Sequence, residues 1–199
     1  MIGPGIQGRW RKIAEAAAAP LARMGVTPNL ATLFGLVLSF PTAFLIATGA
    51  HVAGGAMVLV TGAFDSMDGA LARVTGRQTV FGAFMDSTLD RFVEVVMFGG
   101  LAWYFAAGER RVEAILVLVA LAGSLIVSYT RARAEGLGLD CKVGLLQRPE
   151  RLIILGVGVA LSQWLLVPVL WLLALVTNLT ALQRIVHVYR QTRGASLDR

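Results

Sequence analysis

Residues 65–73 read Asp-Ser-Met-Asp-Gly-Ala-Leu-Ala-Arg, and residues 82–90 read Gly-Ala-Phe-Met-Asp-Ser-Thr-Leu-Asp. Asp65 and Asp68 are three residues apart, so they lie on the same face of a helix. Asp86 and Asp90 are four residues apart and share a helical face for the same reason. The two stretches therefore predict two helices whose acidic faces converge on one site.

The composition places this acidic motif in a membrane protein. Of the 199 residues, 56% are hydrophobic and only 15% are charged, and the mean hydropathy is +0.71. Soluble domains usually contain about 25% charged residues. Aspartates in or beside membrane-spanning helices are costly unless they are paired or bind a metal. We therefore expect a metal site here and not a solvated acidic surface.

Carboxylate oxygens select hard divalent cations, which favours magnesium or manganese over zinc. We predict two Mg²⁺ ions, for which Mn²⁺ can substitute, on four aspartates: Asp65, Asp68, Asp86 and Asp90. A lone aspartate at a helix end usually caps the helix, but capping does not explain four in register. Gly69 and Gly82 let a phosphate group approach closely, and Arg73 is a candidate clamp for pyrophosphate. Glu94 extends the same stripe, and we assign it a structural role.

Long apolar stretches occur along most of the chain, and each bilayer crossing takes about 20 apolar residues. The expected architecture is all-α, with six transmembrane helices over residues 30–49, 53–64 ending in the aspartates, 81–107, 112–129, 152–162 and 165–188. The fifth is the shortest. It spans the bilayer only if residues 148–151 lie at the membrane boundary.

The N-terminal region has a different pattern. Ile6, Trp10 and Ile13 recur at helical spacing with basic residues between them, which predicts an amphipathic helix on the membrane surface. We therefore divide the chain into a juxtamembrane segment (1–26), a six-helix domain (27–190) and a cytoplasmic tail (191–199).

The positions of the basic residues predict the orientation. Of the 18 lysines and arginines, only Arg110 and Arg111 fall on one side of the six-helix topology. By the positive-inside rule, we expect both termini and the acidic site to lie on the cytoplasmic side of the inner membrane of the cell. The basic residues border membrane helices and lack an aromatic stacking surface, so we expect no nucleic-acid partner.

The full spacing from Asp65 to Asp90 is D-x2-D-G-x2-A-R-x8-G-x3-D-x3-D, which resembles the signature of the CDP-alcohol phosphotransferase family. Members of that family are dimeric six-helix membrane proteins that transfer a substituted phosphate from a CDP-linked donor to an alcohol, releasing CMP. The resemblance implies a homodimer in which Asp65, Asp68 and Asp86 are metal ligands. It also implies that Asp90 touches one metal and is the catalytic base that deprotonates the acceptor.

The resemblance implies a second group of residues, which contact the nucleotide and pyrophosphate of CDP-diacylglycerol: Asn29, Leu30, Ala31, Thr32, Asp68, Gly69, Arg73 and Thr79. A site at the membrane boundary suits this donor, because its acyl chains stay in the bilayer while its nucleotide stays in water. Two metals and a nearby carboxylate suit in-line attack on a phosphate.

Arginines in the second half of the chain indicate the acceptor. The stretches Arg-Ala-Arg-Ala-Glu (131–135) and Arg-Pro-Glu-Arg (148–151) resemble those of bacterial phosphatidylinositol phosphate synthases, although a lysine is common there at the position of Arg131. Guanidinium groups bind phosphate bidentately. We predict a phosphorylated polyol, inositol 1-phosphate first, held by Arg131, Arg148, Arg151 and Arg184. Glycerol 3-phosphate satisfies the same charge argument, as does the phosphoinositol step on an archaeal-type ether lipid.

Two other classes of protein use carboxylates in a membrane. A divalent-cation transporter would favour acidic groups near the midplane on separate helices and would not need Gly69, Ala72 and Arg73. A membrane prenyltransferase also acts on a pyrophosphate with Mg²⁺, but it would need a larger chain and two distant acidic motifs. The sequence favours the phosphotransferase over both.

Overall fold

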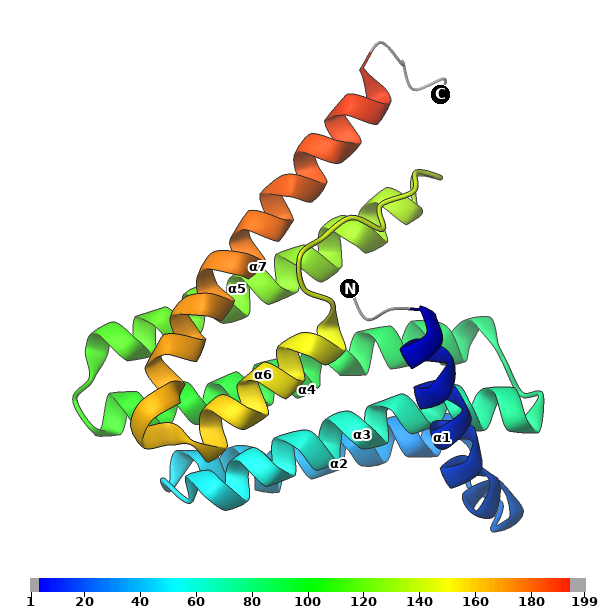
Figure 1. The fold of residues 1–199 in the computed structure, drawn as a ribbon, viewed down its shortest axis with the longest axis horizontal. Helices are drawn as coiled ribbons and strands as arrows, with labels where there is room; N and C mark the ends of the chain where they lie inside the picture. The colour runs from blue at the N-terminus through cyan, green and yellow to red at the C-terminus, as the bar shows by residue number, and fades with distance from the viewer. Residues whose placement is uncertain (1–3, 194–199) are drawn as a thin grey trace.

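The computed structural model describes the backbone of residues 4–193 and the side chains of residues 14–161 and 164–193. The described chain forms helices and no strand (Figure 1): α1 (Pro4–Arg23), α2 (Pro28–Ala47), α3 (His51–Thr75), α4 (Val80–Ala107), α5 (Arg111–Glu135), α6 (Arg148–Ala160) and α7 (Ser162–Thr192). The all-α prediction is confirmed. Most of the predicted tail, residues 194–199, lies outside the described residues.

Helix α2 is the centre of the part that carries the acidic motif, because it packs against both α3 and α4. Glycines allow the closest approaches. A Cβ on Gly100 of α4 would lie 2.5 Å from the carbonyl oxygen of Ala43 on α2. A Cβ on Gly55 of α3 would lie 2.5 Å from the carbonyl oxygen of Gly156 on α6. These helices therefore meet backbone to backbone, as small residues allow in membrane bundles.

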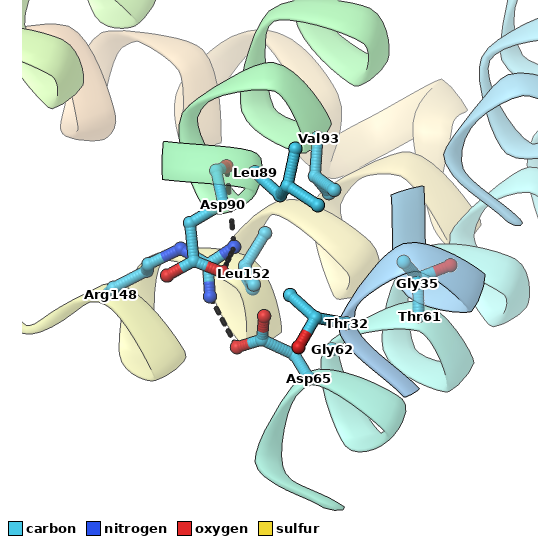
Figure 2. Close-up of a pocket in the computed structure, with 10 residues that line it drawn as sticks. All are labelled: Thr32, Gly35, Thr61, Gly62, Asp65, Leu89, Asp90, Val93, Arg148 and Leu152. Atoms are coloured by element: carbon cyan, nitrogen blue, oxygen red, sulfur yellow. Dashed lines mark hydrogen bonds and ion pairs between the residues drawn. The ribbon is translucent and has the colours of Figure 1, made fainter. Parts of the chain in front are cut away.

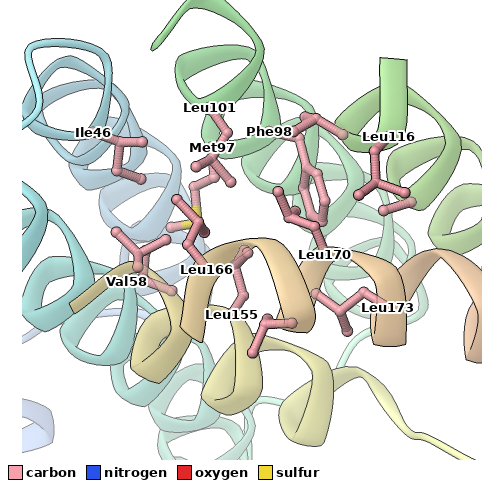
Figure 3. Close-up of a cluster of buried hydrophobic side chains, with 14 of the residues drawn as sticks. Ile46, Val58, Met97, Phe98, Leu101, Leu116, Leu155, Leu166, Leu170 and Leu173 are labelled. Atoms are coloured by element: carbon pink, nitrogen blue, oxygen red, sulfur yellow. The ribbon is translucent and has the colours of Figure 1, made fainter. Parts of the chain in front are cut away.

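One apolar core joins the six helices from α2 to α7. Figure 3 shows its main members, to which every one of these helices contributes: Ile46, Val58, Met97, Phe98, Leu101, Leu116, Leu155, Leu166, Leu170 and Leu173. Helix α1 lies across the ends of α2 and α3 (Figure 1) and uses a separate small cluster of Ala18, Ala31, Ala70 and Leu71. The six helices thus form one bundle with α1 attached to one end.

Three of the described helices are long and apolar enough to cross a membrane: α2, α5 and most of α7. Helices α3 and α4 have 25 and 28 residues, but they carry the charged residues of the motif. Helix α6 has only 13 residues, or about 20 Å at 1.5 Å per residue, against a hydrocarbon core of about 30 Å.

The turn between α3 and α4 brings the two halves of the motif together. We expected the apolar stretch of this helix to end near residue 64. Helix α3 continues through the aspartates, as their helical spacing predicted, and ends at Thr75. Its C-cap is Gly76, which has a φ of 65° and so takes the left-handed conformation that favours glycine. Thr79 then caps α4, its Oγ1 accepting a hydrogen bond of 2.9 Å from the Gly82 amide. The chain therefore reverses within four residues, between Thr75 and Val80.

The close contact between α2 and α4 gives a stability prediction with a control at the neighbouring residue. Gly100→Ala forces a Cβ into the backbone of Ala43, so we expect it to lower stability by about 1–3 kcal/mol. Nothing lies within 4 Å of a Cβ on Gly99. Gly99→Ala should therefore leave the unfolding temperature in detergent unchanged or raise it slightly. Equal unfolding temperatures for the two variants would contradict this packing.

Candidate active site

Three of the four motif aspartates meet in the structure. Asp65 of α3 and Asp86 and Asp90 of α4 each place a carboxylate oxygen within 4.8 Å of the other two. Asp68 lies beside this group, where its carboxyl interacts with that of Asp86. Its Oδ2 accepts a hydrogen bond of 2.8 Å from Thr32 Oγ1 on α2. The predicted convergence of the two acidic faces is therefore present, with Asp68 at its edge.

The geometry of this acidic group fits a divalent cation. Oxygen ligands lie about 2.0–2.6 Å from divalent cations between Mg²⁺ and Ca²⁺ in size, so two oxygen ligands of one ion are at most about 5 Å apart. The three oxygens within 4.8 Å satisfy that limit. An all-carboxylate donor set without histidine or cysteine suits a hard cation. The residues present therefore fit a divalent metal.

Arg148, at the start of α6, lies against the acidic group (Figure 2). Its Nη1 forms an ion pair with Asp65, and its Nη2 lies 2.9 Å from Asp90 Oδ1 and donates to the Asp90 carbonyl oxygen at 3.3 Å. The side chain is only 14% exposed. We had predicted Arg148 among the arginines that hold the acceptor. The structure places it among the aspartates, because α6 packs against α3 and begins beside the motif.

Glu94 links the acidic group to a second cluster. It is buried and accepts hydrogen bonds from Ser124 Oγ at 2.9 Å and from Arg151 Nη2 at 3.2 Å. Arg148 Nε lies 3.7 Å from the same carboxylate. A buried carboxylate with two cationic neighbours agrees with the structural role that we predicted for Glu94.

The remaining predicted acceptor arginines lie in one region. Arg184 of α7 is buried and donates hydrogen bonds to the carbonyl oxygens of Val143 (2.8 Å) and Val127. It also interacts electrostatically with Arg131 and Arg151. Arg131 pairs with Glu135 on the surface. The buried Nε–H of Arg151 finds no hydrogen-bond acceptor among the described residues. Arg131 and Arg151 thus lie near enough to Arg184 to interact with it electrostatically, and Arg151 has an unused donor.

A cavity of about 350 Å³ opens on the other side of the acidic group, between α2, α3 and α4. Six of the eight predicted nucleotide and pyrophosphate contacts line it: Asn29, Thr32, Asp68, Gly69, Arg73 and Thr79. The other two do not. Leu30 is 53% exposed on the outside, and Ala31 packs against α1. Asp68 and Asp86 also line the cavity, so it adjoins the metal-fitting group directly.

Several residues of the site escaped the sequence analysis. Arg77 and Gln78 line the cavity but fall in the unspecified part of the motif. Glu15 binds Arg73 from α1, and Ser124 binds Glu94 from α5. Both contacts join residues far apart in the chain, and no spacing rule reveals such a pair.

Comparisons with known proteins agree with this site. A family model described as CDP-alcohol phosphatidyltransferase matches residues 25–189. The fold and the acidic site are those of a membrane-bound transferase. The chain belongs to the CDP-alcohol phosphatidyltransferase family, and it is therefore an enzyme and not a cation transporter.

Curated relatives extend the match over nearly the whole chain. The phosphatidylinositol phosphate synthase of Mycobacteroides abscessus is 39% identical over 191 residues, which cover 92% of this chain and 86% of that protein. The protein of the same name from Mycobacterium tuberculosis strain H37Rv is 38% identical over 197 residues, covering 94% and 90%. The family resemblance read from the motif is confirmed.

Solved structures share the fold. The crystal structure of M. tuberculosis phosphatidylinositol phosphate synthase with CDP-DAG bound has a TM-score of 0.84 and 37% identity, covering 94% of this chain and 98% of that one. The structure of that enzyme with manganese and citrate also has a TM-score of 0.84, at 36% identity, covering 94% and 92%. Together with the acidic group, these matches indicate a divalent-metal enzyme.

The position of Arg148 gives a prediction about metal and stability. Arg148→Gln removes the cation that neutralises Asp65 and Asp90, so we expect stability to fall by about 3 kcal/mol without divalent metal. Adding Mn²⁺ should restore more stability to the variant than to the wild type, because the ion and the guanidinium compete for the same oxygens. Thermal unfolding in detergent with and without Mn²⁺ measures both effects.

A matched control is Arg131→Gln, which breaks an exposed ion pair with Glu135. Such a pair contributes at most about 1 kcal/mol, and Mn²⁺ should stabilise this variant as much as the wild type. An Arg148→Gln variant with the wild-type response to Mn²⁺ would refute the competition.

Proposed function

We propose that this chain transfers the phosphatidyl group of CDP-diacylglycerol to inositol 1-phosphate, releasing CMP and forming phosphatidylinositol phosphate. The observation that carries the proposal is the position of the acidic group. It lies beside a cavity lined by the expected nucleotide contacts, and Glu94 links it to Arg151, which together with Arg131 interacts electrostatically with Arg184. The names of the relatives, and the CDP-DAG in the M. tuberculosis structure, support the same reaction.

The aspartates divide the work at the reacting phosphate. Asp65, Asp68 and Asp86 are metal ligands, and Asp90 is both a ligand and the catalytic base. Two Mg²⁺ ions, replaceable by Mn²⁺, would supply charge neutralisation of the pyrophosphate when bound. The manganese in a structure 36% identical to this chain, together with the carboxylate donor set, supports this assignment.

The reaction then follows from the residues of this chain. Asp90 accepts the proton of the acceptor hydroxyl, and that oxygen forms a bond to the phosphorus that carries diacylglycerol. The bond from this phosphorus to the oxygen of the CMP phosphate breaks, and its electron pair leaves with CMP. Arg73, Thr79 and Asn29 hold the nucleotide and pyrophosphate side from the cavity. Arg148 positions Asp90 by donating a hydrogen bond to its backbone carbonyl oxygen.

The acceptor phosphate is bound by Arg131, Arg151 and Arg184. Their charges face one region, and the free Nε–H of Arg151 offers a donor to a phosphate oxygen. A dianionic phosphate gains far more from three guanidinium groups than a neutral or zwitterionic alcohol does. Arg148 is left out of this group, since its nitrogens face the carboxylates.

The same proposal includes the membrane arrangement. Helices α2 to α7 form six transmembrane helices within a domain of residues 27–190, and α1 lies on the membrane surface within segment 1–26. Both termini, the tail 191–199 and the active site face the cytoplasm at the inner membrane. The apolar core common to α2–α7 and the side preference of the basic residues support this topology. The proposal also includes a homodimer, as the resemblance to the family implies.

The assignment of Asp90 is tested by Asp90→Asn, which keeps the shape of the side chain and removes the base. We expect kcat for CMP release to fall by about 10²–10⁴, and wild-type activity to require Mg²⁺ or Mn²⁺ and to vanish with a chelator. Asp140→Asn changes an exposed aspartate between α5 and α6 and should keep wild-type kcat. Full turnover by Asp90→Asn would remove Asp90 as the base.

The acceptor is tested by assaying CMP release with inositol 1-phosphate, glycerol 3-phosphate, inositol and serine in parallel. We expect inositol 1-phosphate to be used best. Arg131→Ala should raise its KM about tenfold, the effect of losing one charged hydrogen bond, and leave the KM for CDP-diacylglycerol unchanged. Arg133→Ala, also exposed on α5, is the control. Preference for glycerol 3-phosphate would assign the second acceptor class, and equal use of serine would refute the arginine argument.

A further inference from the structure

One residue that lines the nucleotide cavity, Arg73, contacts α1, which lies outside the six-helix bundle. Arg73 lines the cavity from α3, and its Nε donates a hydrogen bond of 2.9 Å to Glu15 Oε1 on α1. Helix α1 lies across the ends of α2 and α3 at this point (Figure 1). The side chain expected to clamp the pyrophosphate is therefore held by a carboxylate that belongs neither to the motif nor to the six-helix core.

The hydrogen bond to Glu15 determines which edge of the Arg73 guanidinium remains available to a ligand. An arginine offers two donor edges to an oxyanion, one that includes Nε and one made of the two Nη groups. Glu15 takes the Nε of Arg73. Nη1 lies only 3.3 Å from the place where a Cβ on Gly69 would stand, so it lies over the glycine of the motif in the cavity wall. The Nη edge is thereby left to a phosphate.

The helix pairing that presents Glu15 is closely packed. Glu15 and Ala18 are three residues apart on α1, and Ala70 and Arg73 are three apart on α3. Ala18 and Ala70 are both fully buried in the cluster between the helices. The ion pair and the alanine contact thus lie on the same two helical faces. This packing holds the two helix backbones together beside the Glu15–Arg73 ion pair.

We propose that Glu15 is a positioning residue for the donor substrate, which orients the Arg73 guanidinium toward the pyrophosphate of the CDP-lipid. The inference rests on the proposed function, since it takes Arg73 as a pyrophosphate contact. Helix α1 then completes the nucleotide site. The acceptor side does not depend on it, because the arginines there lie on α5, α6 and α7.

The experiment compares Glu15→Ala with Glu113→Ala in the full-length protein in detergent. Glu113 accepts a hydrogen bond from Arg110 Nε at the same 2.9 Å, but at the start of α5. We expect Glu15→Ala to raise the Kd and the KM for CDP-diacylglycerol about threefold to fivefold, the effect of an exposed ion pair. The KM for inositol 1-phosphate should stay constant, and the unfolding temperature should fall no further than in Glu113→Ala, which should leave the Kd for CDP-diacylglycerol unchanged. Glu15→Gln, which keeps an accepting oxygen, should recover part of the loss.

A double-mutant cycle with Arg73→Lys separates positioning from a general effect of α1. Because Glu15 acts through Arg73, Glu15→Ala should add little to the Kd of Arg73→Lys. An equal increase in both backgrounds, or an unchanged Kd in Glu15→Ala, would overturn the proposal. Direct binding of CDP-diacylglycerol is measured without an acceptor. The test therefore remains valid even if the acceptor is not inositol 1-phosphate. A wild-type protein that binds no CDP-lipid would overturn the proposed function as well.

Discussion

Mutual repulsion among closely spaced carboxylates is the constraint on which the rest of this structure depends. Three aspartate oxygens lie within 4.8 Å of one another, and like charges at that distance repel one another. Positive charge must therefore be brought to them. Arg148 supplies it from α6, and the donor set suits a divalent ion. The ion pairs of Arg148 join α3, α4 and α6.

The apolar part of the molecule serves that arrangement. Helix α2 packs between α3 and α4, and contacts at Gly55 and Gly100 let the backbones meet without intervening side chains. Such packing leaves little freedom for a helix to shift, so the acidic faces stay opposed. The hydroxyl of Thr32 on α2 then binds Asp68 at 2.8 Å. The helix that sets the spacing of the bundle thus also contributes to the site.

The chemistry is divided between two sides of the acidic group. On one side is the cavity with Arg73 and Gly69, which suits a nucleotide pyrophosphate. On the other side, Arg184 interacts electrostatically with Arg131 and Arg151. Glu94 lies between the aspartates and these arginines and holds Arg151. In the proposed reaction, this order of charges would bind the donor on the cavity side of the acidic group and the acceptor phosphate on the arginine side.

The sequence by itself determined the helical class, the two acidic faces and the family, because helical periodicity and motif spacing are local properties of the chain. Of the eight residues that it predicted to contact the nucleotide and pyrophosphate, six line the cavity. Only the tertiary structure decided the partners: Arg148 with the aspartates, Glu94 with Ser124 and Arg151, and Glu15 with Arg73. An arginine near a membrane boundary has the same sequence pattern whether it binds substrate or neutralises a carboxylate. Which of these it does depends on the helix that packs beside it.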